Sequence, residues 1–263
     1  TPYEQITDDR NVTAKTWYHQ DKIYDDVTDP KQLEAAAISD AFGNLFWMDG
    51  IFRGKYSDLT LKIFGERLTK HIHEGDLEVV DNDWLGVNFY FNTRIGHVVP
   101  ADHPTRARIL DEFAGFSVES QAQGMLTDMG WPITPNGLGD LLVRWTREYG
   151  DLIPPLFVTE NGVAYDDGLS EDGLVHDDRR ISYLNDHLLS VESAIARGAD
   201  VRGYFQWSLM DNFEWAEGFN KRFGIVHVDY DTQVRTVKES GKWYAKVIET
   251  NGENLTRKFV KFS

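Results

Sequence analysis

The stretch Leu156-Phe157-Val158-Thr159-Glu160-Asn161-Gly162 decides the fold that this sequence predicts. Its apolar and β-branched residues follow two prolines and stop at a carboxylate and an Asn-Gly pair, which is typical of a buried strand. Glu160 therefore stands at the carboxyl end of that strand, where parallel α/β folds place their chemistry. A glutamate held there can attack an electrophilic carbon or accept a proton. The simpler alternative is that Glu160 is an exposed turn residue.

Other strands and helices are expected on both sides of this stretch. Residues 84–91 are apolar at nearly every position, as in a strand covered on both faces, and Asn88 is the polar exception. A further buried strand is expected over 202–207, and a short strand over 225–230. Apolar residues recur at helical spacing over 30–48, 57–71, 137–149, 178–197 and 236–250, whereas 1–30 is expected to be a long loop and 92–135 shows little periodicity. This alternation predicts an α/β fold with a parallel sheet of about three core strands.

The composition limits the possible functions. A length of 263 residues with no recognisable linker suits a single domain over 1–263, and no apolar run approaches the length of a membrane span. The net charge of −16 argues against nucleic acid as a partner, because phosphate binding needs clustered Lys and Arg. The lack of cysteine excludes disulfides and thiolate metal sites, and it fits a cytoplasmic location.

Three further motifs predict neither a cofactor nor a metal. Gly137-Leu138-Gly139 lacks the third glycine and the acidic ribose ligand of a dinucleotide site. His71-Ile72-His73-Glu74 lacks metal-ligand spacing on a clear helix face. The acidic segment 166–178 does not follow the EF-hand pattern, and we expect a solvated surface there.

Longer motifs point to a family. Thr159-Glu160-Asn161-Gly162 resembles the nucleophile motif of glycoside hydrolase family 1, the β-glucosidase and β-galactosidase family. Residues 84–90 resemble the motif of its sixth barrel strand. Residues 203–215 and 221–225 match its eighth-strand region almost residue for residue, and residues 240–244 fit its last helix. The resemblance covers essentially the whole chain.

This resemblance implies an α/β fold that is the C-terminal part of a (β/α)8 TIM barrel, with strands six to eight and helices five to eight. The family's acid/base glutamate belongs to an Asn-Glu-Pro motif at the end of strand four, and no such motif occurs here. An N-terminal half of the same enzyme is therefore the expected partner, needed to close the barrel and supply that glutamate. The first residues carry neither an initiator Met nor a signal peptide, and we interpret them as a chain cut inside a loop.

By the same resemblance, the function is that of a retaining β-glycosidase acting on non-phosphorylated β-linked glucosides or related glycosides. Glu160 is the expected nucleophile, and Tyr90 is expected to hydrogen-bond it and hold its orientation. Glu214 is expected to accept hydrogen bonds from sugar hydroxyls and to repel a phosphate. For Trp131 a core position is the alternative, and Asn88 could serve only to orient its neighbours. The substrate-binding candidates are Trp207, Glu214, Trp215, Phe223, Trp131 and Asn88.

The missing acid/base motif leaves two alternatives open. The chain could be a catalytically inactive carbohydrate-binding fragment, since the sugar-contacting candidates are present without the second carboxylate. It could also be a structural half-barrel that dimerises to bury its open edges. The mass of the protein in solution would separate such a dimer from a complex with an N-terminal half.

Overall fold

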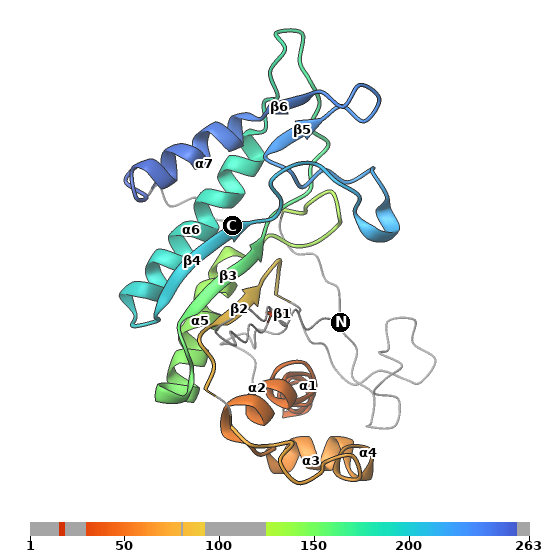
Figure 1. Cartoon of the computed structure of the whole chain (residues 1–263), viewed down its shortest axis with the longest axis vertical. Coiled ribbons are helices and arrows are strands. Elements are labelled where there is room, and N and C mark those ends of the chain that lie inside the picture. The colour runs from red at the N-terminus through yellow and green to blue at the C-terminus, as the bar shows by residue number, and fades with distance from the viewer. Residues whose placement is uncertain (1–15, 19–29, 80, 93–124, 257–263) are drawn as a thin grey trace.

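The computed structural model describes residues 16–18, 30–79, 81–92 and 125–256. Its centre is a parallel sheet of four strands that pair in chain order. These strands are β1 (Thr16–Tyr18), β2 (Leu85–Asn88), β3 (Leu156–Asn161) and β4 (Val201–Gln206). Each parallel pair needs a crossover connection, and helices lie between consecutive strands along the chain (Figure 1). This consecutive order is that of part of a (β/α)8 barrel.

The described helices lie between consecutive strands of the sheet and after β6. Between β1 and β2 lie α1 (Pro30–Asp40), α2 (Phe46–Met48), α3 (Asp58–Phe64) and α4 (Glu66–Thr69), with π-helical turns at Ala41–Leu45 and Asp49–Arg53. Helix α5 (Pro135–Tyr149) connects β2 to β3, and α6 (Asp178–Ala196) connects β3 to β4. Helix α7 (Glu239–Glu249) follows an antiparallel pair, β5 (Val226–Val228) and β6 (Arg235–Val237). Short 3-10 turns occupy Gly150–Leu152 and Trp215–Glu217.

The main core lies between one face of the sheet and the helices α5 and α6. Helix α5 begins at Pro135, whose fixed φ suits a first helical position, and ends before Gly150, which has a φ of +51°. Its apolar residues recur every three or four positions and so form one stripe toward the strands. The buried residues of this core include Leu85, Val87, Leu138, Leu142, Trp145, Leu156, Val158, Val191 and Ala194.

Several predicted elements agree with the structure. The helices expected over 137–149 and 178–197 are α5 and α6, whose bounds differ from the prediction by at most two residues. The helix expected over 30–48 is present and continues through π-helical turns to Arg53. The burial of all four residues of β2 confirms that this strand is covered on both faces. The segment 93–124, predicted to lack periodicity, lies outside the described residues.

Three predictions about strands were wrong. Residues 16–18 form β1 rather than part of a loop, because three residues paired with β2 are too short to show a periodic pattern. The last helix starts at Glu239 rather than 236, because Arg235–Val237 pair with β5. Strand β4 is not fully buried. It is an edge strand of the described sheet, and Phe205 on it is 57% exposed.

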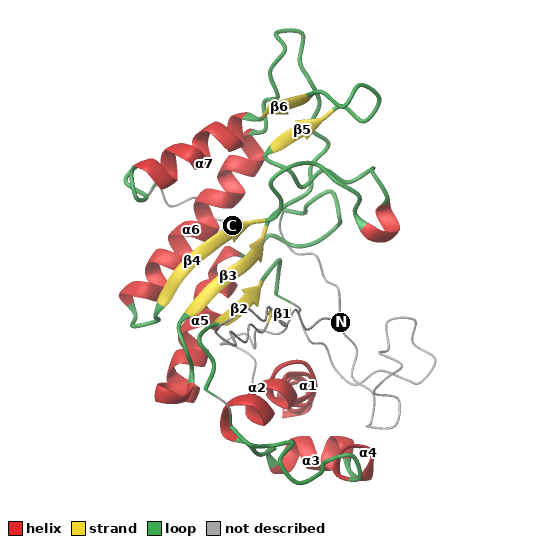
Figure 2. Cartoon of the chain, in the orientation of Figure 1, coloured by secondary structure: helices red, strands yellow, loops and turns green. Residues whose placement is uncertain are grey.

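Loops leave the carboxyl ends of β2, β3 and β4 on the same side of the sheet (Figure 2). These loops comprise residues 89–92, 162–177 and 207–225, together with the turn at 125–134 that precedes α5. They carry most of the residues that the sequence nominated for function. In a parallel sheet, that edge is where side chains from different strands can converge.

Candidate active site

Glu160 lies one residue before the end of β3, and Tyr90 follows the end of β2. The Tyr90 hydroxyl donates a hydrogen bond of 2.7 Å to Glu160 Oε2, as the sequence predicted. The strands hold the two residues together, because the Phe89 amide donates to the Glu160 carbonyl at 2.9 Å. A hydrogen bond to a carboxylate favours its ionised form, which is the form able to attack carbon.

Strand β3 contains one more residue than either neighbour just before its end. Between the pairs Val87–Val158 and Asn88–Glu160, β2 advances by one residue while β3 advances by two. Between the pairs Val158–Tyr204 and Asn161–Gln206, β3 advances by three residues while β4 advances by two. An extra residue of this kind is a β-bulge, which redirects the side chains that follow it. Here it falls at Thr159, immediately before Glu160.

Aromatic rings surround the Tyr90 phenol. The Trp131 ring lies 5.3 Å from the Tyr90 ring and 6.1 Å from that of Phe223, between centroids. Phe223 is 6.3 Å from Tyr90 and is only 2% exposed. Such distances are typical of packed aromatic pairs. Tyr90, Trp131 and Phe223 therefore form one cluster beside Glu160, so the structure brings these predicted residues together.

A second carboxylate reaches the same region from the loop after β4. Burial raises the pKa of Glu214, the Trp207 indole opposes that rise by donating a hydrogen bond, and the charge of Glu160 adds to it. The electrostatic effect of Glu160 on Glu214 shows that the two carboxylates lie close enough to interact. Glu214 is thus hydrogen-bonded to Trp207 and lies within electrostatic range of Glu160.

Two predicted residues stand apart from this cluster. Trp215 is 81% exposed and begins a 3-10 turn with a φ of +43°. Asn88 is 1% exposed, and its Oδ1 accepts a 2.9 Å hydrogen bond from the Thr159 hydroxyl. The geometry of Asn88 fits the alternative that it orients its neighbours, because its amide oxygen holds the residue that precedes Glu160.

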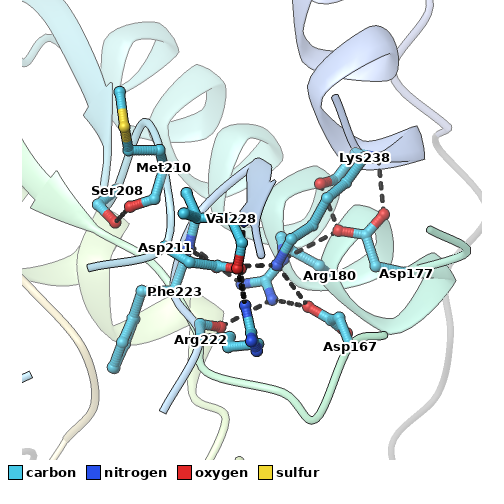
Figure 3. Close-up of polar contacts among 12 residues, drawn as sticks. Asp167, Asp177, Arg180, Ser208, Met210, Asp211, Arg222, Phe223, Val228 and Lys238 are labelled. Carbon is cyan, nitrogen blue, oxygen red and sulfur yellow. Dashed lines mark hydrogen bonds and ion pairs between the residues drawn. The ribbon is translucent and has the colours of Figure 1, made fainter. Parts of the chain in front are cut away.

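A network of buried ion pairs lies beside the loops that carry these residues (Figure 3). Lys238 contacts Asp167 at 3.0 Å and Asp211 at 3.1 Å. Arg180 pairs with Asp167 and, at 3.0 Å, with Asp177. A sixth member, Arg222, lies 2.7 Å from Asp211 and is only partly buried. The three carboxylates therefore balance three cations.

The network fixes the two loops that flank Glu160. The Arg180 guanidinium donates to the Val163 carbonyl after β3 and, at 3.3 Å, to the Phe223 carbonyl after β4. Asp211 accepts from the Gly224 amide at 3.0 Å. Buried charges need both partners and hydrogen bonds to be tolerated, and both are present here. Phe223 is consequently held against the Tyr90 ring by a hydrogen bond to its main chain.

The sequence did not reveal this network. The segment 166–178 was predicted to be a solvated surface, which is wrong for Asp167 and Asp177, at 8% and 3% exposure. Arg180 and Lys238 are completely buried. Arg180 and Asp177 are three positions apart, but the other partners lie 11 to 71 positions apart in the sequence, so a local pattern could not have identified the network as a whole.

Two further properties concern the parts of the chain that the structure describes. Within them, no helix has both the length and the apolar character needed to cross a membrane. The same ranges contain no group of three or more His, Cys, Asp or Glu side chains arranged to hold a metal ion.

Parallel strands in chain order, with carboxylates and indole rings at their carboxyl ends, are the arrangement of a TIM-barrel glycoside hydrolase. Comparison with known proteins identifies the family. The chain belongs to glycosyl hydrolase family 1, whose model matches residues 3–253.

Individual relatives agree with this assignment. The chain is 42% identical over 225 residues to a 1,4-β-D-glucan glucohydrolase of Thermotoga neapolitana, a match covering 84% of this chain and 47% of that protein. It is 36% identical over 273 residues to a 6-phospho-β-galactosidase of Leptotrichia buccalis, covering 91% and 56%. The solved structure of a psychrophilic β-glucosidase from Micrococcus antarcticus superposes with a TM-score of 0.80 at 40% identity, covering 91% and 53%. The chain therefore spans about half the length of the relatives that it matches.

Proposed function

We propose that this chain is the nucleophile-bearing part of a retaining β-glycosidase that acts on non-phosphorylated β-glycosides. The observation that carries the proposal is the 2.7 Å hydrogen bond from the Tyr90 hydroxyl to Glu160 Oε2, at the carboxyl end of β3. A carboxylate fixed by a phenol on a rigid strand is well suited to in-line attack on a sugar. Membership of glycosyl hydrolase family 1 supports the same reaction class.

The reaction uses Glu160 as a carboxylate nucleophile. A Glu160 oxygen forms a bond to the anomeric carbon while the bond from that carbon to the leaving oxygen breaks. A second glutamate protonates the leaving oxygen and then takes a proton from the water that releases the sugar. Retaining enzymes hold the two carboxyl groups about 5–5.5 Å apart. We assign this second group to the N-terminal half, because the Asn-Glu-Pro motif is absent from these 263 residues.

The sugar would lie between the aromatic cluster and the loop after β4. Trp131 and the exposed Trp215 would offer apolar ring faces to it, and the buried Phe223 would support the Trp131 ring from behind. Trp207 holds the Glu214 carboxylate. Glu214 would accept hydrogen bonds from the sugar's 4- and 6-hydroxyls. An ionised Glu214 would repel a phosphate at this position.

A phosphorylated substrate is the second candidate, because 6-phospho-β-galactosidases are among the relatives at 36% and 34% identity. A direct comparison of an aryl β-glucoside with its 6-phosphate separates the two candidates. We expect hydrolysis of the neutral glucoside. Faster turnover of the phosphate would overturn the role given to Glu214.

The N-terminal half of a family 1 barrel is the proposed partner, and a cytoplasmic location belongs to the same proposal. Two observations support this partner. The described sheet ends at β4, which has no neighbour on its outer edge, and Phe205 on that strand is 57% exposed. The loop that follows β4 exposes further large apolar side chains, among them Leu209, Phe213 and Phe219. An unpaired edge bordered by apolar side chains favours association with another chain.

The decisive experiment co-expresses the chain with the N-terminal half of a family 1 relative and measures hydrolysis of an aryl β-glucoside. Glu160→Gln should remove nearly all of the activity, because the amide is a poor nucleophile. Glu217→Gln serves as the matched control, since Glu217 is exposed on the loop after β4 and should tolerate the change. Unchanged turnover in Glu160→Gln would exclude the nucleophile assignment. Sugar binding without turnover would favour the inactive carbohydrate-binding fragment.

A further inference from the structure

The extra residue in β3 determines which face of the sheet Glu160 occupies. Successive side chains of a strand alternate between faces. Leu156 and Val158 face the helices and lie in the core that α5 and α6 cover. Strict alternation from Val158 would send Glu160 to the helix-covered face and Asn161 to the opposite one.

The observed contacts are the reverse of that expectation. Asn161 lies on the helix-covered face, because its Nδ2 donates to the hydroxyl of Tyr183 on α6 at 3.1 Å. Thr159 bonds to Asn88, and Glu160 bonds to Tyr90, so both side chains project toward the residues of the site. The bulge at Thr159 therefore places two consecutive side chains on the site face and returns Asn161 to the core face.

The carboxamide of Asn161 is completely buried and joins three parts of the fold. Its Nδ2 donates to the Phe89 carbonyl at 2.7 Å, and its Oδ1 accepts from the Tyr204 hydroxyl on β4 at 2.6 Å. The orientation of the amide is determined by chemistry, because a carbonyl can only accept. Tyr183 in turn donates to the Tyr90 carbonyl at 3.3 Å. The main-chain carbonyls of Phe89 and Tyr90 are thus both held by Asn161 or its direct partner.

We propose that Asn161 is a positioning residue for the nucleophile. Its carboxamide locks the bulge by binding to α6 and to the ends of β2 and β4, and so keeps Glu160 on the site face with Tyr90 aligned to it. This inference rests on the proposed function, in which Glu160 is the nucleophile. The alternative is that Asn161 only satisfies buried hydrogen bonds and stabilises the fold.

The test measures the hydrogen bond between Tyr90 and Glu160 rather than turnover. The chain contains 11 tyrosines, so labelling tyrosine with carbon-13 at Cζ gives a small set of resonances, and Tyr90→Phe identifies that of Tyr90. Glu160→Gln defines the position of this resonance when the carboxylate is absent. We expect the Tyr90 resonance in Asn161→Ala and in Tyr204→Phe to move from the wild-type position toward the position in Glu160→Gln. The shift should be larger in Asn161→Ala, which loses every contact of the carboxamide.

Tyr244→Phe is the matched control. It removes a hydroxyl that donates to the Tyr204 carbonyl at 3.0 Å and is not a partner of the Asn161 side chain. Its Tyr90 resonance should stay at the wild-type position. If Asn161→Ala does not fold, Tyr204→Phe decides the question, because it removes a single oxygen. An unmoved Tyr90 resonance in the folded variants would overturn the positioning role, even if they melt at lower temperature.

The outcome is independent of the proposed catalysis. Full hydrolysis by Glu160→Gln would refute the nucleophile while leaving the measured geometry of Tyr90 unchanged. Conversely, a Tyr90 resonance that stays at the wild-type position in Asn161→Ala and Tyr204→Phe would refute the positioning role, whatever the activity of Glu160→Gln.

Discussion

Gly162 lies two residues after Glu160, where β3 passes close to the main chain after β4. A Cβ at this position would overlap the carbonyl oxygen of Trp207. The close approach accompanies a hydrogen bond of 2.9 Å from the Trp207 amide to the Asn161 carbonyl. The glycine therefore allows the ends of β3 and β4 to meet beside the site.

Replacing this glycine should cost stability. We expect Gly162→Ala to lower the free energy of unfolding by about 1–3 kcal/mol, because the backbone must move to admit the methyl group. Gly168→Ala is the matched control, since a Cβ there meets no atom within 4 Å. The denaturation midpoints in urea provide the measurement. Equal midpoints for the two variants would contradict the close approach.

At the residue scale, the sequence predicted only those site residues that belong to a local motif. Glu160 and Tyr90 were identified because each follows an apolar run and matches a motif, and the structure contains their hydrogen bond. Asn161 was seen only as part of a motif. Its side chain binds groups 72, 22 and 43 positions away, and such partners become visible only when the chain is folded.

Helix α6 carries a histidine that folding keeps neutral. The Nδ1 of His187 lies 2.7 Å from the Tyr183 carbonyl, so Nδ1 bears the proton, while the buried Nε2 has no hydrogen-bond partner. The His187 ring stacks on the Tyr183 ring, with centroids 3.9 Å apart. Burial lowers the pKa of His187 to about 4, because a charged ring would bring an unpaired donor into the core.

Helix α6 should therefore make the fold sensitive to acid. In the unfolded chain, His187 titrates near the ordinary histidine pKa. At pH values between that pKa and about 4, the unfolded state therefore binds a proton that the folded state does not bind. Stability contributed by His187 is complete above the unfolded pKa and is lost as the pH falls toward 4. Between pH 7 and pH 5 the loss should be about 2 kcal/mol.

Urea denaturation at the two pH values measures this loss. His187→Gln should show a smaller loss between them than the wild-type chain. His71→Gln, at an exposed position, is the control and should keep the wild-type dependence. A pH dependence that His187→Gln leaves unchanged would show that other groups govern the acid response.

At the element scale, long periodic segments were predictable and short ones were not. Helices α5 and α6 follow a continuous apolar stripe, so their positions were evident from spacing. Strands β1 and β6 have three residues each, and only their pairing with β2 and β5 makes them strands. The bulge in β3 was also hidden, because it exists only relative to the neighbouring strands.

For the molecule as a whole, the buried ion pairs connect the last two βα units. Lys238, which precedes α7, contacts Asp167 from the loop after β3 and Asp211 from the loop after β4 (Figure 3). Burial lowers the pKa of Lys238, and the nearby Arg180 charge acts in the same direction. Both carboxylates oppose this effect, so the lysine depends on them to remain charged.

Removing this lysine should destabilise the whole domain. We expect Lys238→Met to lower the free energy of unfolding by about 3–5 kcal/mol, because it leaves buried carboxylates without their full complement of positive charge. Lys242→Met is the control, since Lys242 pairs with Glu239 at the surface and should change stability by less than about 1 kcal/mol. Thermal and urea unfolding provide the measurement. Similar effects for the two lysines would show that the network is not a source of stability.

The architecture was predictable from the sequence only through the family motifs. Alternating helices and buried strands predicted a parallel sheet, and the motifs placed its strands late in a barrel. Within the described residues the sheet has four strands rather than three, and β1 and β4 are its two edges. Composition and spacing could not show the ion network, because pairing of charges is a property of the folded molecule.

The extra residue at Thr159 also makes the direction of the carboxylate depend on the bulge. If the strand held Thr159 without a bulge, regular alternation from Val158 would turn Glu160 toward the helices and Asn161 toward the opposite face. Deleting Thr159 would instead remove the extra residue opposite β2 and leave Glu160 on the site face by alternation alone. The bulge therefore allows the strand to present a threonine and a carboxylate, one after the other, on the same face.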